Sequence, residues 1–179
     1  MQFDEFGPLA LAAVVMTIAA RFDIRYRRIP NMLCLAGFLL GVALHGWLGG
    51  WSGAGMALLS GLALLFGMFL FFAIGWLGAG DVKLLAAAGA IGGTLDTALA
   101  IAFFTVVLGA LMGIGLVMLG GQLRQLGHKL KEAAMAAAII KRLPAYQADE
   151  QMAATSLPYA IPIAAGTLLG MAYTMGIFG

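Results

Sequence analysis

The sequence predicts an all-α, polytopic membrane protein with six transmembrane helices. The chain has 179 residues, of which 63% are hydrophobic and only 10% are charged, and its mean hydropathy is +1.00. A water-soluble domain of this size could not cover its surface with so few polar groups. The charged residues also cluster and leave uncharged runs, several of them longer than the roughly 20 residues that cross a bilayer. These runs are 6–20, 29–80, 84–95, 97–123 and 151–179.

The first half of the chain accounts for three of the six helices. The run 6–20 is short for a span, but it ends at Arg21, whose long side chain can reach back to the headgroups. The run 29–80 is long enough for two crossings, and a glycine-rich cluster with a tryptophan, residues 49–53, breaks it where an interfacial turn would lie. We therefore expect helices at about 6–20, 32–48 and 54–77.

The second half accounts for the other three helices, which complete a single domain over 1–179. The segment 84–93 is too short to span unless it begins at the preceding Gly-Ala-Gly-Asp turn and lies in a thinned or sheltered part of the bundle. The segments 97–119 and 157–177 are long enough for a fifth and a sixth crossing. Pro158 stands near the start of the last one, where a missing N–H costs least.

The basic residues set the orientation of these helices. Six crossings place 21–31, 78–83 and 121–156 on one side of the membrane, and all ten Lys and Arg residues lie in those three segments. The positive-inside rule makes that side cytoplasmic, so both termini are expected outside.

The last cytoplasmic segment carries an amphipathic pattern. Apolar residues recur at spacings of three and four from Leu123 to Ile140, with basic residues between them. This pattern predicts a helix on the inner leaflet whose basic side chains meet anionic lipid, and a solvated connector helix is the alternative. Membrane lipid is therefore an expected partner, whereas a net charge of +2 is too small for a nucleic-acid binder.

Two aspartates are informative because ionisable groups near hydrocarbon are costly. Asp23 follows the first helix, and Asp81 lies in the segment Gly78-Ala-Gly80-Asp-Val-Lys83, which the topology brings to the same cytoplasmic boundary. Two such carboxylates can activate water, since one takes a proton from water while the other gives a proton to a carbonyl oxygen. The glycines would permit a tight turn and a close approach of substrate backbone. Lys83 could bias the ionised form or bind a headgroup.

Each aspartate also has a purely structural interpretation. Asp23 has several arginine neighbours and could be an ion-paired interfacial residue, and Asp81 could be the N-cap of the short helix that follows. No metal and no cofactor are expected. The two histidines, His45 and His128, are placed on opposite sides of the membrane, and the chain has one cysteine.

Two segments carry a resemblance to a known family. One is Asp23-Ile-Arg-Tyr-Arg-Arg-Ile-Pro30-Asn31 before an apolar span, and the other is Gly-Ala-Gly-Asp-Val-Lys-Leu-Leu-Ala-Ala-Ala-Gly at 78–89. Together they resemble the signatures of the type IV prepilin peptidases, which are GxGD-type intramembrane aspartyl proteases, and the resemblance covers about 20–120. It implies that Asp23 and Asp81 are the catalytic pair. The supporting residues that it indicates are Pro30, Asn31, Gly78, Gly80 and Lys83.

The same resemblance implies a location in the bacterial inner membrane, a substrate and a branch of the family. The substrate is a prepilin with a basic leader and a hydrophobic helix, cut on the cytoplasmic side, typically just after a glycine. Pro158-Tyr-Ala-Ile-Pro162 is similar to the proline motif that lines the active site of presenilin-like enzymes. Larger members carry an additional domain with paired cysteines, associated with N-methylation. This chain lacks both, so it resembles the short branch that serves tight-adherence or Flp-type pili.

Two functions of other classes stay open on the sequence alone. A small proton- or cation-coupled transporter would use the aspartates as a relay, and it predicts charges near mid-membrane and an inverted repeat. A non-catalytic subunit of a pilus or secretion assembly would make the aspartates dispensable. Small-residue pairs at GxxxG spacing predict close helix packing, within the chain or in a homodimer. They are Gly37/Gly41, Gly109/Gly113 and Gly166/Gly170.

Overall fold

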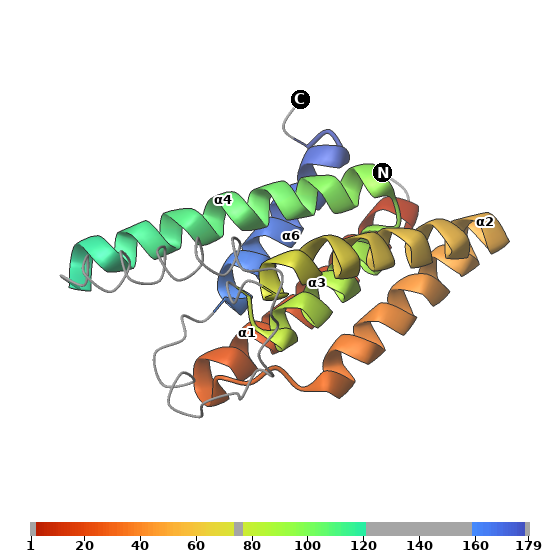
Figure 1. Cartoon of the computed structure of the whole chain (residues 1–179). Helices are drawn as coiled ribbons and strands as arrows, with labels where there is room; N and C mark the ends of the chain where they lie inside the picture. The colour runs from red at the N-terminus through yellow and green to blue at the C-terminus, as the bar shows by residue number, and fades with distance from the viewer. Residues whose placement is uncertain (1–2, 74–76, 121–158, 178–179) are drawn as a thin grey trace, which may run out of the picture.

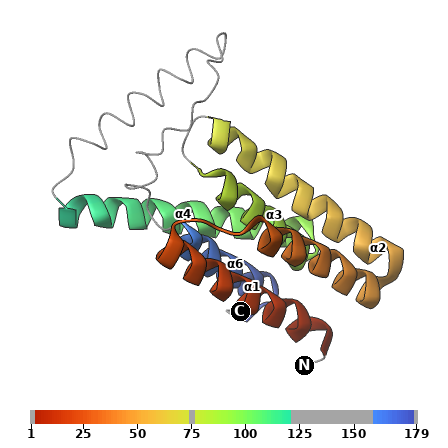
Figure 2. The same ribbon diagram turned by 90° about the horizontal axis from the view of Figure 1, so that it is seen from below.

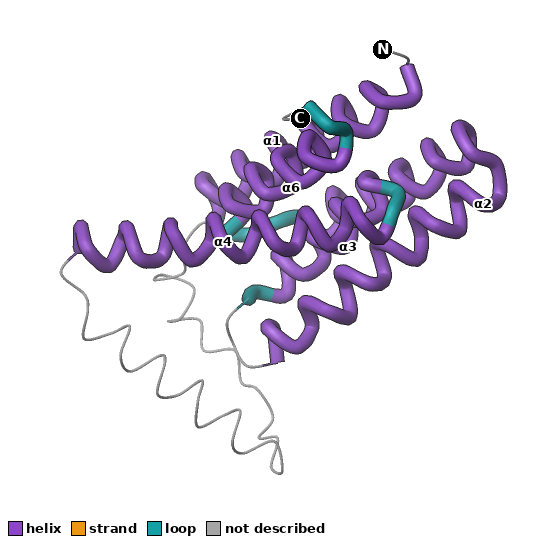
Figure 3. The backbone as a smooth tube through the Cα atoms, turned by 90° about the horizontal axis from the view of Figure 1, so that it is seen from above, coloured by secondary structure: helices purple, strands orange, loops and turns teal. Residues whose placement is uncertain are grey.

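The computed structural model describes residues 3–73, 77–120 and 159–177, and the regular structure in these ranges is entirely helical. The helices are α1 (Phe3–Tyr26), α2 (Asn31–Ala73), α3 (Ala79–Gly92), α4 (Leu95–Gly120) and α6 (Ala160–Thr174). Short loops join α1 to α2 and α3 to α4 (Figure 3). The predicted amphipathic helix within 121–156 and the predicted site residue Pro158 lie outside the described residues.

The helix α2 is a hairpin of two antiparallel arms. Gly50 has φ 63° and ψ −152°, a backbone conformation that is essentially restricted to glycine. The chain reverses there, so that a side chain at Gly53 would overlap the carbonyl of His45. The two arms, 31–49 and 51–73, then run side by side (Figure 1). The reversal lies within the glycine-rich cluster where the sequence predicts a turn.

The short helix α3 lies between the two arms of α2 (Figure 2). A Cβ atom at Gly41 in the first arm would lie 2.7 Å from the carbonyl carbon of Ala90, and one at Gly61 in the second arm would lie 2.9 Å from the oxygen of Ala86. Glycine in the arms therefore lets the helix backbones approach closely. With 14 residues, α3 is about 21 Å long, shorter than a bilayer core, and the enclosing arms shelter it as expected.

The last helix, α6, packs against α1 and α4. Its glycines face α4: Gly166 lies against Thr105, and a Cβ atom at Gly170 would lie 2.7 Å from the backbone nitrogen of Ile101. This GxxxG pair therefore serves packing within the chain. The pair Gly37/Gly41 also packs inside the chain, whereas Gly113 has no neighbour within 4 Å among the described residues.

The helix α1 extends further than the sequence predicts. Its expected end was Ala20, but it continues to Tyr26, so Asp23 lies in its last turn instead of after it. The chain leaves the helix at Arg27, which has a left-handed φ of 52°. The arginines in this last stretch are exposed. The two ends differ because the first charged residue marks where a helix leaves the apolar layer of the membrane. The helix itself can continue beyond that layer.

Three helices are long and apolar enough to cross a membrane by length and composition: Phe6–Tyr26, Asn31–Ala73 and Leu95–Gly115. The second of these counts once although it reverses at Gly50. Large apolar side chains are exposed on the outside of the bundle, such as Phe66 and Phe103, and lipid is the solvent that suits such a surface. The chain is therefore a membrane protein. The six crossings and their orientation stay predictions.

Candidate active site

The two candidate aspartates lie at the same end of the helical bundle. Asp23 is in the last turn of α1 and contacts the start of α6, so these two helices are antiparallel. Asp81 is in the first turn of α3, and the negative charge of Asp23 acts on its carboxyl group. The start of α1 and the end of α6 lie together at the opposite end (Figure 1). Among the described residues, the two aspartates therefore share one end of the bundle, and the membrane side on which this end lies stays a prediction.

Asp23 is held by α6, a helix far from it in the sequence. Only 8% of the residue is exposed, and its Oδ2 atom accepts a hydrogen bond of 3.1 Å from the backbone N–H of Ala160, the first residue of α6. A helix N-terminus has unpaired N–H groups and the positive end of the helix dipole. A carboxylate at this point is therefore favourable, whatever its arginine neighbours contribute.

Asp81 is held by its own helix start. The N-cap of α3 is Gly78, with φ −76° and ψ 154°, so the expectation that Asp81 could itself be the N-cap is wrong. Asp81 stands three residues later, and its Oδ2 atom accepts a hydrogen bond of 3.1 Å from the backbone N–H of Gly78. This contact fixes one carboxyl oxygen and pairs one of the N–H groups that a helix start leaves free.

The two glycines of the motif differ in how crowded they are. A Cβ atom at Gly78 would lie 3.0 Å from Asp81 Oδ2, a tight contact that would move the carboxyl group by a few tenths of an ångström. A Cβ atom at Gly80 would lie 3.5 Å from the Cβ atom of Ile29, which is an ordinary van der Waals distance. Of the two glycines, the first is therefore the one whose substitution would press on the Asp81 carboxyl group.

The environment of Asp81 favours its protonated form. Burial raises the pKa of Asp81 from 3.8 to about 6, against the opposing effect of the Gly78 N–H bond, and the charge of Asp23 raises it further. Both causes disfavour a second negative charge at this end of the bundle. The pair can therefore hold one proton at a pH where an isolated aspartate would be ionised.

The supporting residues fall into two groups. Lys83 Nζ donates a hydrogen bond of 3.0 Å to Asn31 Oδ1, an exposed contact that joins the start of α3 to the start of α2. The carbonyl of Pro30 accepts the N–H of Leu33 at 3.0 Å, so Pro30 begins the first turn of α2. The structure thus brings Asn31 and Lys83 together, whereas Pro30 acts on the local backbone.

One residue at the site was not singled out from the sequence. Tyr159 is the N-cap of α6, directly before the residue that binds Asp23. Its ring lies against α4, where a Cβ atom at Gly109 would lie 3.1 Å from the Cε1 atom of the ring. The only sequence signal was its place in the Pro158–Pro162 segment, where a ring with a polar tip opens an apolar run.

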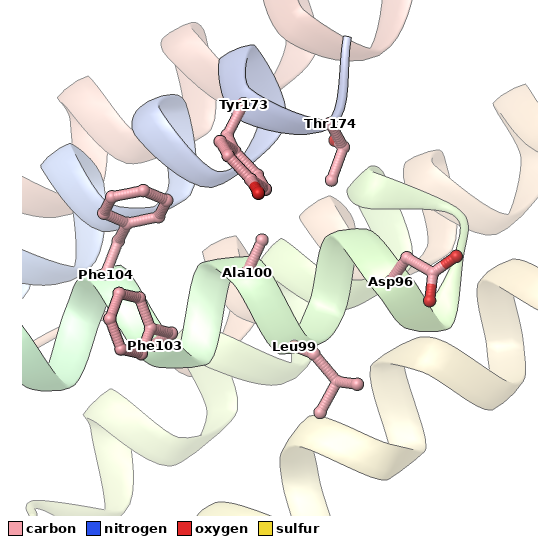
Figure 4. A pocket seen from close by; sticks show the side chains of 7 residues that line it. All are labelled: Asp96, Leu99, Ala100, Phe103, Phe104, Tyr173 and Thr174. Atoms are coloured by element: carbon pink, nitrogen blue, oxygen red, sulfur yellow. The ribbon is translucent and has the colours of Figure 1, made fainter. Parts of the chain in front are cut away.

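A separate cavity of about 430 Å³ lies between α4 and α6. Figure 4 shows Asp96 at one side of it and the rings of Phe104 and Tyr173 at the other. Asp96 begins α4 and Thr174 ends α6, so the cavity is at the end of α6 remote from Asp23. A helix of 15 residues separates the two ends by about 22 Å, and the cavity is therefore not part of the aspartate site.

Comparison with protein families gave one match. The model of the type IV leader peptidase family matches residues 10–117, a range that contains both aspartates and exceeds half of the chain. A comparison with curated proteins and a comparison with solved structures found no match.

Proposed function

The chain belongs to the type IV leader peptidase family, and we propose that it is an intramembrane aspartyl endopeptidase for prepilin-type substrates. Family membership makes it a leader-peptidase-type protease. The proposal adds the catalytic pair Asp23 and Asp81, the cytoplasmic face of the inner membrane as the place of cleavage, and several crossings of that membrane. One observation supports the pair above all: the start of α3, which carries Asp81, lies against Ile29 and Asn31, directly after the last turn of α1, which carries Asp23.

The two aspartates have different roles in this proposal. Asp23, beside the positive end of α6, is the ionised member that takes a proton from water. Asp81, whose pKa is raised to about 6, is the protonated member that gives its proton to the carbonyl oxygen of the scissile bond. Water adds to the carbonyl carbon, and a neutral gem-diol forms.

The second half of the reaction restores both groups. The proton that Asp23 took from water passes to the leaving nitrogen, the carbon–nitrogen bond breaks, and Asp81 recovers a proton from one hydroxyl of the gem-diol. Every proton is accounted for, and the enzyme ends in its initial state with a free carboxyl and a free amine as products. The residues of the chain thus supply the whole acid–base cycle.

The depth of the aspartates fits the proposed substrate. A prepilin carries a polar leader before a hydrophobic helix, so its cleavage site lies at the membrane boundary. Asp23 lies three residues from the end of the candidate span Phe6–Tyr26, and Asp81 precedes the apolar part of α3. Both positions are at helix ends, and a transporter relay would instead require charged residues near the middle of a span.

Mass spectrometry of a candidate prepilin tests this function. The prepilin is expressed with and without the full chain, and its mass is determined after purification from the membrane. The peptidase predicts loss of the leader only when the chain is present, and the mass locates the cut and reports any added methyl group. A prepilin of unchanged mass for every candidate from the same pilus system would favour the assembly subunit instead.

A further inference from the structure

Each of the two aspartates binds the N–H of a helix start, but the two donors have different origins. Asp81 binds the N–H of Gly78, the N-cap of its own helix, so this contact forms together with α3. Asp23 binds the N–H of Ala160, which belongs to another helix and lies 137 positions away. The orientation of the Asp23 carboxyl group therefore depends on how α6 packs against α1.

The first turn of α6 presents a specific N–H group to Asp23. Pro162 has no N–H, and the N–H of Ile163 is bonded to the carbonyl of Tyr159 at 3.2 Å. The N–H of Ala160 is bonded to Asp23 Oδ2 at 3.1 Å, and Ala160 is fully buried. A hydrogen bond to an ionised carboxylate is stronger where bulk water does not compete for the donor.

This bond leaves the second oxygen of Asp23 for the reaction. Among the described residues, no donor is bonded to the Oδ1 atom of Asp23. A general base needs a lone pair that is aimed at the proton it removes. Because the N–H at Oδ2 fixes the plane of the carboxyl group, it also fixes the direction of the lone pairs on Oδ1.

We propose that Ala160 is a positioning residue of the reaction, and that its backbone N–H holds the Asp23 carboxylate in the orientation in which Oδ1 takes the proton from water. The inference rests on the proposed function, because it requires Asp23 to be the base. It concerns the N–H group alone, since the side chain of Ala160 is a methyl group without acid–base chemistry. It makes α6, which lies outside the residues that match the family, a working part of the active site.

Replacing one peptide bond by an ester tests this N–H group. In the full chain, Ala160 is replaced by its α-hydroxy analogue, lactic acid, which keeps the methyl group and has an oxygen in place of the N–H. The protein is reconstituted in phospholipid vesicles and supplied with a purified prepilin. Loss of the donor lets the carboxyl group rotate, so kcat should fall about 10-fold with KM unchanged. The ionised carboxylate is also less stabilised, so the acidic limb of the pH profile should move up by about one unit.

The ester also makes the carbonyl of Tyr159 a weaker acceptor, and a second ester is the matched control for this side effect. The α-hydroxy analogue of isoleucine in place of Ile163 removes the N–H that binds the Tyr159 carbonyl, and it leaves the N–H of Ala160 in place. This control should keep the acidic limb of the wild type, with kcat within about 2-fold. Ala160→Gly keeps the N–H without the methyl group, and its acidic limb should not move either.

Infrared spectroscopy tests the same contact without a substrate. The band of the protonated Asp23 carboxyl group is isolated as the difference between each protein and its Asp23→Asn counterpart. In the Ala160 ester this band should persist to a pH about one unit higher than in the wild type, because the ionised form has lost a donor.

Four outcomes would overturn the inference. Wild-type kcat and acidic limb in the Ala160 ester would leave α6 with a packing role, and equal changes in the two esters would mean a loosened helix start. An Ala160 ester that fails to accumulate, when the Ile163 ester accumulates, would make the bond a folding contact. A rise in KM alone would mean contact with the substrate.

The variant Asp23→Asn separates these outcomes from a failure of the proposed function. In each of the four cases, an inactive Asp23→Asn variant would leave the proposed function standing. Full activity of Asp23→Asn would overturn the proposed function and, with it, the role of Ala160.

Discussion

Asp23 in the first helix accepts a hydrogen bond from the backbone of Ala160, 137 positions later, at the start of the last described helix. The residues that match the leader peptidase family end at 117. The support of one proposed catalytic residue therefore lies outside the matched range. The helix α6 therefore contributes to the candidate site as well as to the bundle, since its first N–H group binds the end of α1.

The raised pKa of Asp81 predicts a pH dependence of stability. Because the pKa of Asp81 is about 6 in the folded chain against 3.8 ordinarily, the folded state binds this proton more tightly than the unfolded state. The favourable contribution is present below about pH 4 and is lost as the pH rises to about 6. Asp81→Asn removes this ionisation, so its melting temperature relative to the wild type should rise by a few degrees between pH 4 and pH 7.5.

Thermal unfolding of both proteins in the same detergent, followed by circular dichroism, measures that difference. Asp96→Asn is the control, because this exposed aspartate lies at the opposite end of the bundle. A difference in melting temperature between Asp81→Asn and the wild type that is equal at the two pH values would contradict the environment assigned to Asp81.

The two motif glycines should differ in their tolerance of a methyl group. Gly78→Ala would displace the Asp81 carboxyl group from the Gly78 N–H, because the added Cβ atom lies 3.0 Å from Oδ2, and leader cleavage should fall at least 10-fold. Gly80→Ala meets only ordinary contacts and should retain most of the activity. Initial rates of prepilin cleavage at matched enzyme levels decide this. Equal losses in the two variants would show that the loss of activity in Gly78→Ala does not come from displacement of the Asp81 carboxyl group.

Because Lys83 and Asn31 are in contact, the effects of substituting them on the cleavage rate should not be additive. Because the hydrogen bond joins two helix starts beside Asp81, Lys83→Ala and Asn31→Ala should each lower the cleavage rate about 2- to 5-fold. The double variant should be no worse than either single variant. The measurement is a double-mutant cycle, in which cleavage rates are compared for the wild type, the two single variants and the double variant. An unaltered rate in Lys83→Ala would instead assign this lysine to the lipid surface.

Asp96 provides a test of the topology. It begins α4 at the end of the bundle remote from the aspartate pair, so Asp96→Asn should leave prepilin cleavage within about 2-fold of the wild type. The measurement is the ratio of mature to full-length prepilin in cells. An inactive variant that is nonetheless present in the membrane would mean that this end of the bundle takes part in the reaction.

Much of the fold follows from local sequence patterns. Apolar runs predict where the helices lie, and the glycine-rich cluster predicts the reversal that the structure has at Gly50. The end of α1 was wrong by several residues, because arginines report the depth of a residue in the membrane and not the end of hydrogen bonding. Length alone would not place α3, since its stability depends on the two arms of α2 that enclose it.

The candidate site, like the fold, can be predicted only in part from the sequence. A shared location of Asp23 and Asp81 follows from counting crossings, and Asn31 and Lys83 follow from their motifs. Their mutual hydrogen bond does not follow, because it requires two helix starts to lie side by side. The contact of Asp23 with Ala160 and the place of Tyr159 depend on the direction in which α6 packs, for which a single sequence carries no local signal.

The most direct measurement is the conversion of a co-expressed prepilin by Asp23→Asn and by Asp81→Asn, with membrane levels of each variant checked by immunoblot. Each substitution keeps the shape of the side chain and removes its acid–base function. Both variants should accumulate in the membrane and leave the prepilin at full length, while Asp96→Asn matures it normally. Normal maturation by either of the first two variants would contradict the aspartate pair.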